Sequence, residues 1–296
     1  MLKKPGIILL ALGISTLLSS CLVSQKDVET IARTTDELRI YESGDRIDYD
    51  ITVVISSDDP PTFRQGVMRV LWEQTADLTN PVGGPNIGPV LKETTTITYD
   101  DNTEPESIVI RYISQDEKGK MVLHAIDDGT NTYWPYSDGT VFPVDGLGTT
   151  PVIFDSPMVI GITPANSGEA YVIAECSNNL CNSQLYKFRD ESVSVVGDTI
   201  AITTSMGKFS NPFQIKFEGG IAPSGALAIE LLGDIRDACG TSSETISHGT
   251  AAGVGNLFVL PEIGIIRMEN ACRVTIGNGT IVLYTATIRS TNIALP

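Results

Sequence analysis

The chain has 296 residues, of which 42% are hydrophobic and 19% charged, and its formal net charge at pH 7 is −16. A chain of this length and composition folds around a sizeable core, which excludes a disordered, collagen-like or coiled-coil protein. The excess of 36 acidic over 20 basic residues argues against nucleic acid and anionic lipid headgroups as partners, because both need a positively charged surface.

Residues 1–20 have the layout of an export signal. The basic pair Lys3-Lys4 is followed by an apolar run from Ile7 to Leu18 and then by the tetrapeptide Leu18-Ser19-Ser20-Cys21. The apolar run is well short of the roughly 20 residues that a helix needs to cross a bilayer. We therefore expect a signal peptide that is cleaved before Cys21, and no permanent transmembrane helix.

The tetrapeptide resembles the lipobox of bacterial lipoproteins. The resemblance implies that the Cys21 thiol receives a diacylglyceryl group and that its amino group is acylated after cleavage, with a fatty acid such as palmitate. Several acyl chains form a lasting anchor without a transmembrane helix. Because Leu22, and not aspartate, follows the cysteine, the resemblance also implies the outer membrane, with the protein facing the periplasm. An ordinary cleaved signal that ends in a cysteine is the alternative.

The polar residues after the anchor are expected to form a tether. We assign residues 21–38 to the lipidated anchor and tether, in which Ser24–Glu37 would hold the folded part away from the membrane. A short helix is the alternative, because Val28, Ile31 and Ala32 have helical spacing.

The remainder of the chain predicts an all-β fold, mainly antiparallel, with a curved sheet arranged as a half-barrel or a sandwich. Between Ile47 and Ser56, apolar residues at odd positions alternate with mostly polar residues at even positions, and Val54 is the exception. No stretch outside the signal keeps a helical periodicity over three turns, which disfavours nucleotide-binding α/β folds. Similar short runs predict strands at Val67–Gln74, Thr94–Tyr99, Ile108–Ser114, Met121–Ile126, Ala170–Cys176, Gln184–Phe188, Ile200–Ser205, Phe213–Phe217, Ala226–Leu232, Leu257–Leu260, Ile263–Met268, Arg273–Ile276 and Thr280–Arg289.

Glycine-containing turns connect some of these strands. Asp116–Gly119 and Gly277–Gly279 predict antiparallel hairpins, because glycine and asparagine tolerate the positive φ of tight turns. The glycine-rich stretch Gly249–Gly255 is interpreted as a loop, because it lacks the lysine and the strand-to-helix context of a phosphate-binding loop.

Two stretches rich in proline and glycine interrupt the strand pattern. Thr79–Pro89 predicts a surface loop, since proline lacks the amide proton that an inner strand must donate. Pro135–Pro157 predicts a boundary between two β-rich lobes, at residues 39–150 and 151–296. One continuous domain is the alternative.

The segment Leu260–Arg267 (LPEIGIIR) is similar to a late strand of β-rich bacterial envelope proteins whose curved sheet forms a half-barrel, a group that includes lipoprotein carriers. The resemblance implies a concave face that could hold an acyl chain. It covers less than a tenth of the chain, and no binding residue is transferred from it.

Four cysteines remain after Cys21 is assigned to lipidation: Cys176, Cys181, Cys239 and Cys272. An even number in an exported chain predicts disulfides, and we favour pairing Cys176 with Cys181 and Cys239 with Cys272. A zinc site is disfavoured, because the spacing lacks paired C-x₂-C motifs. We expect no metal and no cofactor.

No catalytic residue is predicted. His124 lies within an apolar alternation, which favours a packed, hydrogen-bonded histidine. His248 lies in a loop rich in glycine, serine and threonine, and it could activate one of Ser242, Ser243 or Ser247. No G-x-S-x-G motif supports that arrangement.

Clusters of acidic and of aromatic residues are the remaining candidates for a binding site. Asp100–Glu106 and Asp127–Asn131 could bind Ca²⁺, but neither fits the EF-hand pattern, and solvated turns explain both. The aromatic group Tyr133–Tyr136 could stack on a sugar or close one end of a sheet, and we favour the second interpretation.

The sequence therefore predicts a membrane-anchored envelope lipoprotein that acts as a non-enzymatic binding or structural module. Its expected partners are the membrane, through lipid on Cys21, and an envelope protein or a lipid ligand. The alternatives are an acyl-chain-binding half-barrel carrier, an envelope hydrolase that uses His248 and a nearby serine, and a surface-displayed protein whose aromatic cluster contacts host or matrix sugars.

Overall fold

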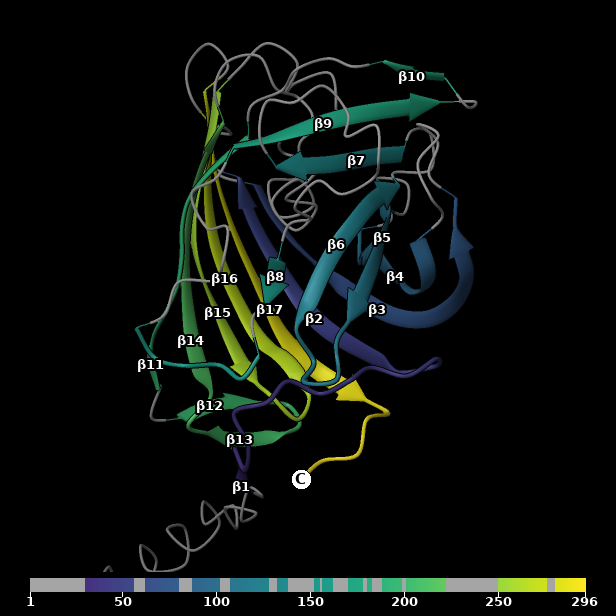
Figure 1. Ribbon diagram of the computed structural model, residues 1–296. Helices are drawn as coiled ribbons and strands as arrows, with labels where there is room; N and C mark the ends of the chain where they lie inside the picture. The colour runs from purple at the N-terminus through teal and green to yellow at the C-terminus, as the bar shows by residue number, and fades with distance from the viewer. Residues whose placement is uncertain are drawn as a thin grey trace, which may run out of the picture.

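The computed structural model describes residues 30–296 except for 56–61, 80–86, 102–106, 128–131, 138–151, 155, 162–169, 178–179, 183–187, 199–200, 222–249 and 276–279. The described residues form seventeen β-strands and no α-helix (Figure 1). The predicted all-β, mainly antiparallel fold with a curved sheet is confirmed. No helix in the described ranges has the length and hydropathy needed to cross a membrane.

The strands follow one another in the order shown in Figure 1. Those in the first part of the chain are β1 (Thr30–Ala32), β2 (Arg46–Ile55), β3 (Thr62–Leu78), β4 (Ile87–Tyr99), β5 (Ser107–Gln115), β6 (Met121–Asp127), β7 (Thr132–Ser137) and β8 (Val152–Phe154). Those in the second part are β9 (Ala170–Ser177), β10 (Leu180–Asn182), β11 (Phe188–Asp198), β12 (Ala201–Thr204), β13 (Gly207–Ser210), β14 (Phe213–Ile221), β15 (Thr250–Leu260), β16 (Gly264–Thr275) and β17 (Thr280–Thr291).

One large sheet contains most of the strands. Its order is β10-β9-β11-β14-β15-β16-β17-β2-β3-β4-β5-β6-β7, with β8 beside β6 and a further pairing between β7 and β9. The sheet curves so that β14, β15 and β16 face β4, β5 and β6 across its interior, with β17, β2 and β3 joining the two sides (Figure 1). Since β17 pairs with β2, strands from both of the lobes expected from the sequence share this sheet.

The alternation in β2 separates an inner from an outer face. Ile47, Tyr49 and Ile51 point inward and are almost completely buried, and each such apolar side chain contributes about 1.5–3 kcal/mol relative to exposure. The exceptional Val54 lies on the outer face, opposite Phe63 of β3 and Leu283 of β17. The buried side chains of the two sides pack together inside the curve and form the main core.

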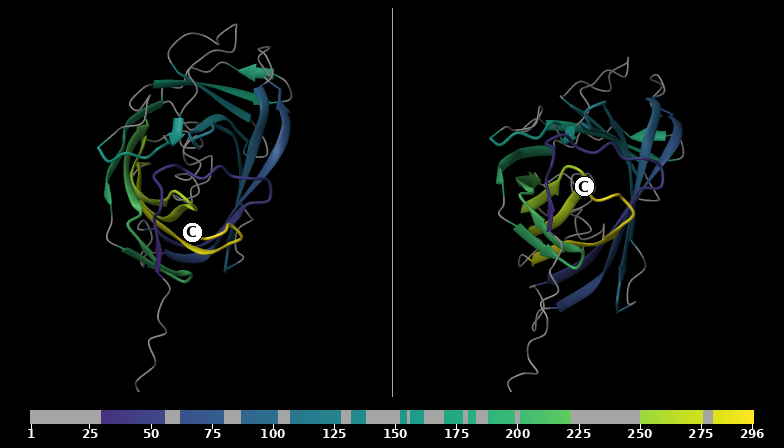
Figure 2. Two further views of the ribbon diagram at one scale, coloured as in Figure 1. Left: turned by 60° about the horizontal axis from the view of Figure 1, so that its bottom comes forward. Right: turned by 90° about the horizontal axis from the view of Figure 1, so that it is seen from below.

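Residues 33–45, which we call the strap, cross the lower end of the curved sheet (Figure 2). The strap is bound from both sides: Arg39 N donates to Pro261 O at 2.8 Å, and Tyr41 N donates to Gln115 Oε1 at 2.9 Å. The strap also packs closely against the turn between β5 and β6, where a Cβ on Gly119 would overlap with the backbone of Leu38. The strap therefore belongs to the folded body.

This arrangement corrects part of the assignment of residues 21–38 as anchor and tether. Thr30–Ala32 form β1, which pairs in parallel with β13 in a small sheet of order β1-β13-β12. The segment from Thr30 to Leu38 is thus neither a free tether nor a helix. The physical reason is that Ile31 and Leu38 bury their apolar side chains in the core when the segment is extended.

The interpretation of Gly249–Gly255 as a loop is wrong for Thr250–Gly255, which form the first half of β15. Small residues gave no strand signal there, but the backbone pairs with β14 on one side and β16 on the other. The two runs Ile263–Met268 and Arg273–Ile276 likewise belong to one strand, β16, up to Thr275. Neighbouring strands supply the hydrogen bonds in both cases, so local propensity is overridden.

Both predicted hairpins have antiparallel strands, β5 with β6 and β16 with β17. The loop expected at Thr79–Pro89 is shorter than predicted, because Ile87–Pro89 already belong to β4. The stretch Pro135–Pro157 contains the end of β7 and all of β8.

Candidate functional site

A cavity of about 40 Å³ lies inside the curved sheet, beside the strap. Both sides of the sheet and the strap contribute to its wall. The lining residues are Leu38, Tyr41, Tyr49, Met68, Val70, Trp72, Glu93, Arg111, Met121, Phe154, Val259, Gly264, Ile265 and Met268.

Three neighbouring inner positions on β3, β4 and β5 place Trp72, Glu93 and Arg111 side by side. The Arg111 Nε donates to Glu93 Oε1 at 2.6 Å, its Nη2 forms an ion pair with the same oxygen, and Trp72 Nε1 donates to Oε2 at 3.1 Å. Glu93 is only 3% exposed. A buried carboxylate is tolerated when it is paired and hydrogen-bonded in this way, because its desolvation is otherwise very costly.

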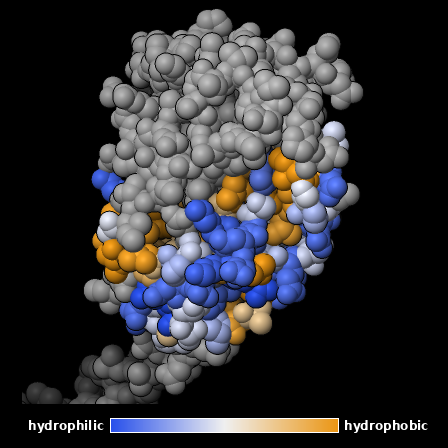
Figure 3. All heavy atoms as spheres, in the orientation of Figure 1, coloured by the Kyte–Doolittle hydropathy of each residue, from blue (hydrophilic) through white to orange (hydrophobic). Residues whose placement is uncertain are grey.

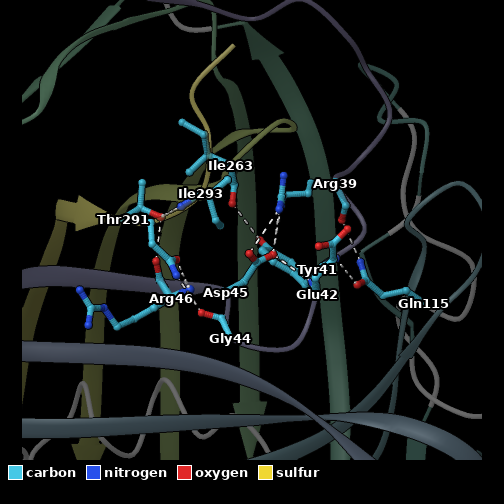
Figure 4. A network of polar contacts seen from close by, with 11 residues as sticks. Arg39, Tyr41, Glu42, Gly44, Asp45, Arg46, Gln115, Ile263, Thr291 and Ile293 are labelled. Atoms are coloured by element: carbon cyan, nitrogen blue, oxygen red, sulfur yellow. Dashed lines mark hydrogen bonds and ion pairs between the residues drawn. The ribbon is translucent and has the colours of Figure 1, made fainter.

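Tyr41 of the strap covers the Trp72 end of this row. The two rings stack with centroids 4.0 Å apart and an interplanar angle of 6°, and Tyr41 Oη donates to Ile263 O at 3.1 Å (Figure 4). Gly264 has φ +116°, and a Cβ there would overlap with the Tyr41 hydroxyl. Burial raises the pKa of Tyr41 well above its usual range, and the nearby Glu93 charge raises it further, so the ring stays neutral.

The part of the strap that carries Tyr41 is held by its own ion pair. Arg39 donates from Nε to Asp45 Oδ2 at 3.1 Å, and the same oxygen accepts the Glu42 amide at 2.9 Å (Figure 4). On the other side, Gln115 Nε2 donates to Arg39 O at 3.0 Å. These bonds fix the backbone on both sides of Tyr41.

Methionines form much of the apolar wall, with Met68, Met121 and Met268 contributed by three different strands. Methionine is flexible and polarisable, and such side chains adapt to ligands of different shape. The cavity has room for about three water molecules at roughly 10–15 Å³ each. An apolar ligand would therefore have to displace Leu38 and Tyr41 or shift the methionines.

Glu93 and Arg111 were not among the residues singled out from the sequence. A signal was present, because the alternation of β4 places Glu93 on the same face as the apolar Ile97 and Tyr99. An acidic residue on a buried face needs a cation, and Arg111 is the matching residue on the next strand. Only the register of β4 and β5 brings the two together.

His124 and Ser114 form a second polar pair, on neighbouring strands β6 and β5. The His124 Nε2 and Ser114 Oγ atoms are 2.8 Å apart, which confirms the predicted hydrogen bond of His124. Burial lowers the pKa of His124 and favours the neutral ring.

The predicted disulfide residues are only partly described. Cys176 and Cys181 are directly opposite each other in the antiparallel pair of β9 and β10, a register in which a disulfide can form. Cys272 lies in β16, opposite Gly253 and Val282. Cys239 is outside the described residues, and both disulfides stay predictions.

The other predicted site residues, Cys21 and His248, also lie outside the described residues. Of the acidic clusters, Asp101 pairs with Arg64 at 3.0 Å, and Arg64 lies over the Tyr99 ring at 3.8 Å. Asp101 is thus engaged in an ion pair. Where side chains are described, no group of three or more potential metal ligands occurs.

Comparisons with known proteins add one structural similarity. No family model and no curated protein matches the chain. Among solved structures, the chain is similar to a protein from Parabacteroides distasonis ATCC 8503 described as a "putative lipoprotein", with a TM-score of 0.42 and 11% sequence identity. The similarity covers 88% of this chain and 99% of the other. At this TM-score no residue role and no function can be transferred.

Proposed function

We propose that this protein is a lipid-anchored binding module of the bacterial envelope, without enzymatic activity, and that it receives an apolar ligand between the two sides of its curved sheet. The lipid on Cys21 would hold it at the outer membrane, on the periplasmic side. The anchor part of the proposal rests on the lipobox-like tetrapeptide.

The binding part of the proposal rests on one observation: the apolar inner face lines a cavity whose wall contains three methionines and stacked aromatic rings. Ligand sites in proteins are concave, mostly apolar and contain a few polar groups that orient the ligand. Here the Glu93–Arg111 pair supplies the polar group. An acyl chain or another elongated apolar molecule is the class of ligand that this wall favours.

The size of the cavity sets a condition on binding. Because about 40 Å³ is too small for an acyl chain, the ligand needs side chains of the wall to move, and we propose that it displaces Leu38 and Tyr41 of the strap. Tyr41 stacks on Trp72 and can leave only if its hydrogen bond to Ile263 is broken. We therefore expect binding to be accompanied by a change in the fluorescence of Trp72.

The experiment uses the full lipidated chain, purified in detergent from its native membranes, and titrates it with a dansyl-labelled fatty acid. Met268→Trp fills the cavity from the inner face, whereas Leu283→Trp adds the same ring on the outer face, where the leucine is 49% exposed. We expect saturable binding by the natural protein and by Leu283→Trp, and at least tenfold weaker binding by Met268→Trp.

Thermal unfolding of both variants checks that the fold is retained. If the natural protein binds none of a series of labelled fatty acids and carries no extractable lipid, the binding part of the proposal is wrong. An unmodified Cys21 in the mass spectrum of native material would overturn the anchor part.

A further inference from the structure

Exposed apolar side chains gather at one end of the molecule. In the described part of the chain, eight large apolar side chains are exposed. Five of them lie in the strap or near it, and we call these the anchor-end group: Ile40, Val159, Ile160, Val196 and Leu295.

Ile40 belongs to the strap itself, and hydrogen bonds of neighbouring residues bring the other four close to it. Met158 N donates to Asp36 O at 2.8 Å, which places Val159 and Ile160 beside the strap. Gly161 N donates to Val195 O at 2.8 Å, so Val196 lies next to them, and Figure 3 shows a hydrophobic area on this flank.

The C-terminus reaches the same end of the molecule. Asn292 Nδ2 donates to Gly44 O at 2.8 Å, which brings the last residues of the chain, with Leu295, beside the strap (Figure 1). The three remaining exposed apolar side chains lie elsewhere: Phe63 and Leu283 both pair with Val54 near the far end of β2, and Ile108 is near the start of β5.

The chain enters the folded body at this end. The first described strand, β1, begins at Thr30 and pairs with β13, beside the strap (Figures 1 and 2). Cys21 precedes Thr30 by nine residues, which span at most about 30 Å when fully extended. A lipid on Cys21 therefore keeps the anchor-end group within reach of the bilayer surface.

This end of the molecule offers anionic lipid no basic patch in the two segments that form the strap and the neighbouring turn. The segment 33–46 contains three basic and four acidic residues, and the β5–β6 turn, 116–120, contains two of each, a balance close to the average of a chain with a net charge of −16. Anionic headgroups need a positively charged surface. Exposed apolar side chains beside these segments therefore favour zwitterionic over anionic phospholipid.

We infer that the anchor-end group contacts the membrane, with its apolar side chains in the boundary between headgroups and acyl chains of zwitterionic phospholipid. This inference rests on the proposed lipidation of Cys21. The body then rests on the bilayer through the strap end, and the opposite end of the curved sheet faces away from the membrane.

The test uses the full lipidated chain reconstituted into vesicles of phosphatidylcholine and phosphatidylethanolamine, with phosphatidylcholine that is brominated near the headgroup end of its acyl chains as a quencher. Ile160→Trp places an additional indole in the anchor-end group, and Leu283→Trp places one on the far part of the outer face. The two replaced side chains are 50% and 49% exposed, so they form a matched pair. The two native tryptophans are common to both variants.

Flotation of the vesicles is measured first, because it reports the lipid anchor independently. We expect both variants to float, and the brominated lipid to quench the added fluorescence of Ile160→Trp but not that of Leu283→Trp. Val196→Trp repeats the test at a second position of the group if Ile160→Trp does not fold. Protein that does not float contradicts the anchor itself, whereas floating protein with equal, unquenched emission from both positions overturns the membrane contact alone.

Discussion

The inner and outer faces of the sheet contain the same kind of ion pair in different surroundings. On the inner face, the side chains of Glu93 and Arg111 are only 4% and 17% exposed. On the outer face, Asp50 and Arg289 form a pair whose side chains are 55% and 54% exposed. The alternation of side chains along the strands places one pair inside and the other outside. A shift of the strand register by one residue would exchange the two faces. It would thereby decide whether breaking an ion pair costs much of the free energy of unfolding or almost none.

Asp48 shows an intermediate case on the outer face. Burial by itself would raise the pKa of its carboxyl group, but hydrogen bonds from Arg69 and Ser290, together with the charges of Arg69 and Arg46, lower the pKa below its usual range. Its stabilising effect is therefore present above the pKa of the unfolded chain and is lost in acid. Donors from two neighbouring strands make this buried carboxylate tolerable.

The largest effect is expected from breaking the inner pair. Glu93→Ala removes the carboxylate that accompanies the Arg111 charge, and we expect the free energy of unfolding to fall by about 3–5 kcal/mol in urea denaturation. The double variant Glu93→Leu with Arg111→Leu removes both charges and should be close to the natural protein. Equal losses in the single and double variants would show that packing, and not the charge, matters at this position.

A somewhat smaller effect is expected at the strap. Gly119 has φ +84°, and its Cβ would overlap with the backbone of Leu38, so Gly119→Ala should lower the free energy of unfolding by about 2–4 kcal/mol. Gly44→Ala is the matched control, because Gly44 has φ +97° but nothing within 4 Å of the added Cβ. Gly44→Ala should lower the free energy of unfolding by about 1–2 kcal/mol, because only backbone strain contributes. A similar decrease in the free energy of unfolding in both variants would contradict close packing of the strap against the β5–β6 turn.

The burial of His124 on the outer face predicts that the stability of the folded state depends on pH. Burial lowers its pKa in the folded state, so the unfolded chain binds the proton more tightly and stability falls as the pH drops below about 6.5. His124→Gln should remove this part of the decrease in the melting temperature between about pH 6.5 and 5, whereas Ser114→Ala keeps the imidazole and should retain it. Asp48 contributes only in stronger acid, so the two effects are separable. An unchanged profile in His124→Gln would contradict the burial effect.

The smallest effect is expected for the exposed pair. Arg289→Gln removes the ion pair with Asp50 but leaves both positions in water, so the free energy of unfolding should change by less than about 0.5 kcal/mol. Denaturation in low and high salt provides the measurement. A loss comparable to that of Glu93→Ala would refute the contrast between the two faces.

Sequence patterns predicted many of the strands with alternating residues but missed others, including most of β11 after Phe188. The alternation in β2 and the glycine turn between β5 and β6 were sufficient, because each carries its signal within a few residues. The first half of β15 and the short strands β1 and β8 carry no such signal. They are strands because neighbouring strands satisfy their backbone groups, and a local pattern does not contain that information.

The sequence by itself determined the fold class and the inner and outer faces of the alternating strands, since these depend on residues close together in the chain. Only the tertiary structure decided that Glu93 and Arg111 meet, that Tyr41 stacks on Trp72, and that the segment after Thr30 docks across the end of the sheet. Each of these contacts depends on strand register or on a close approach at a glycine. Both are set by the packing of the whole chain, so no local stretch of sequence specifies them.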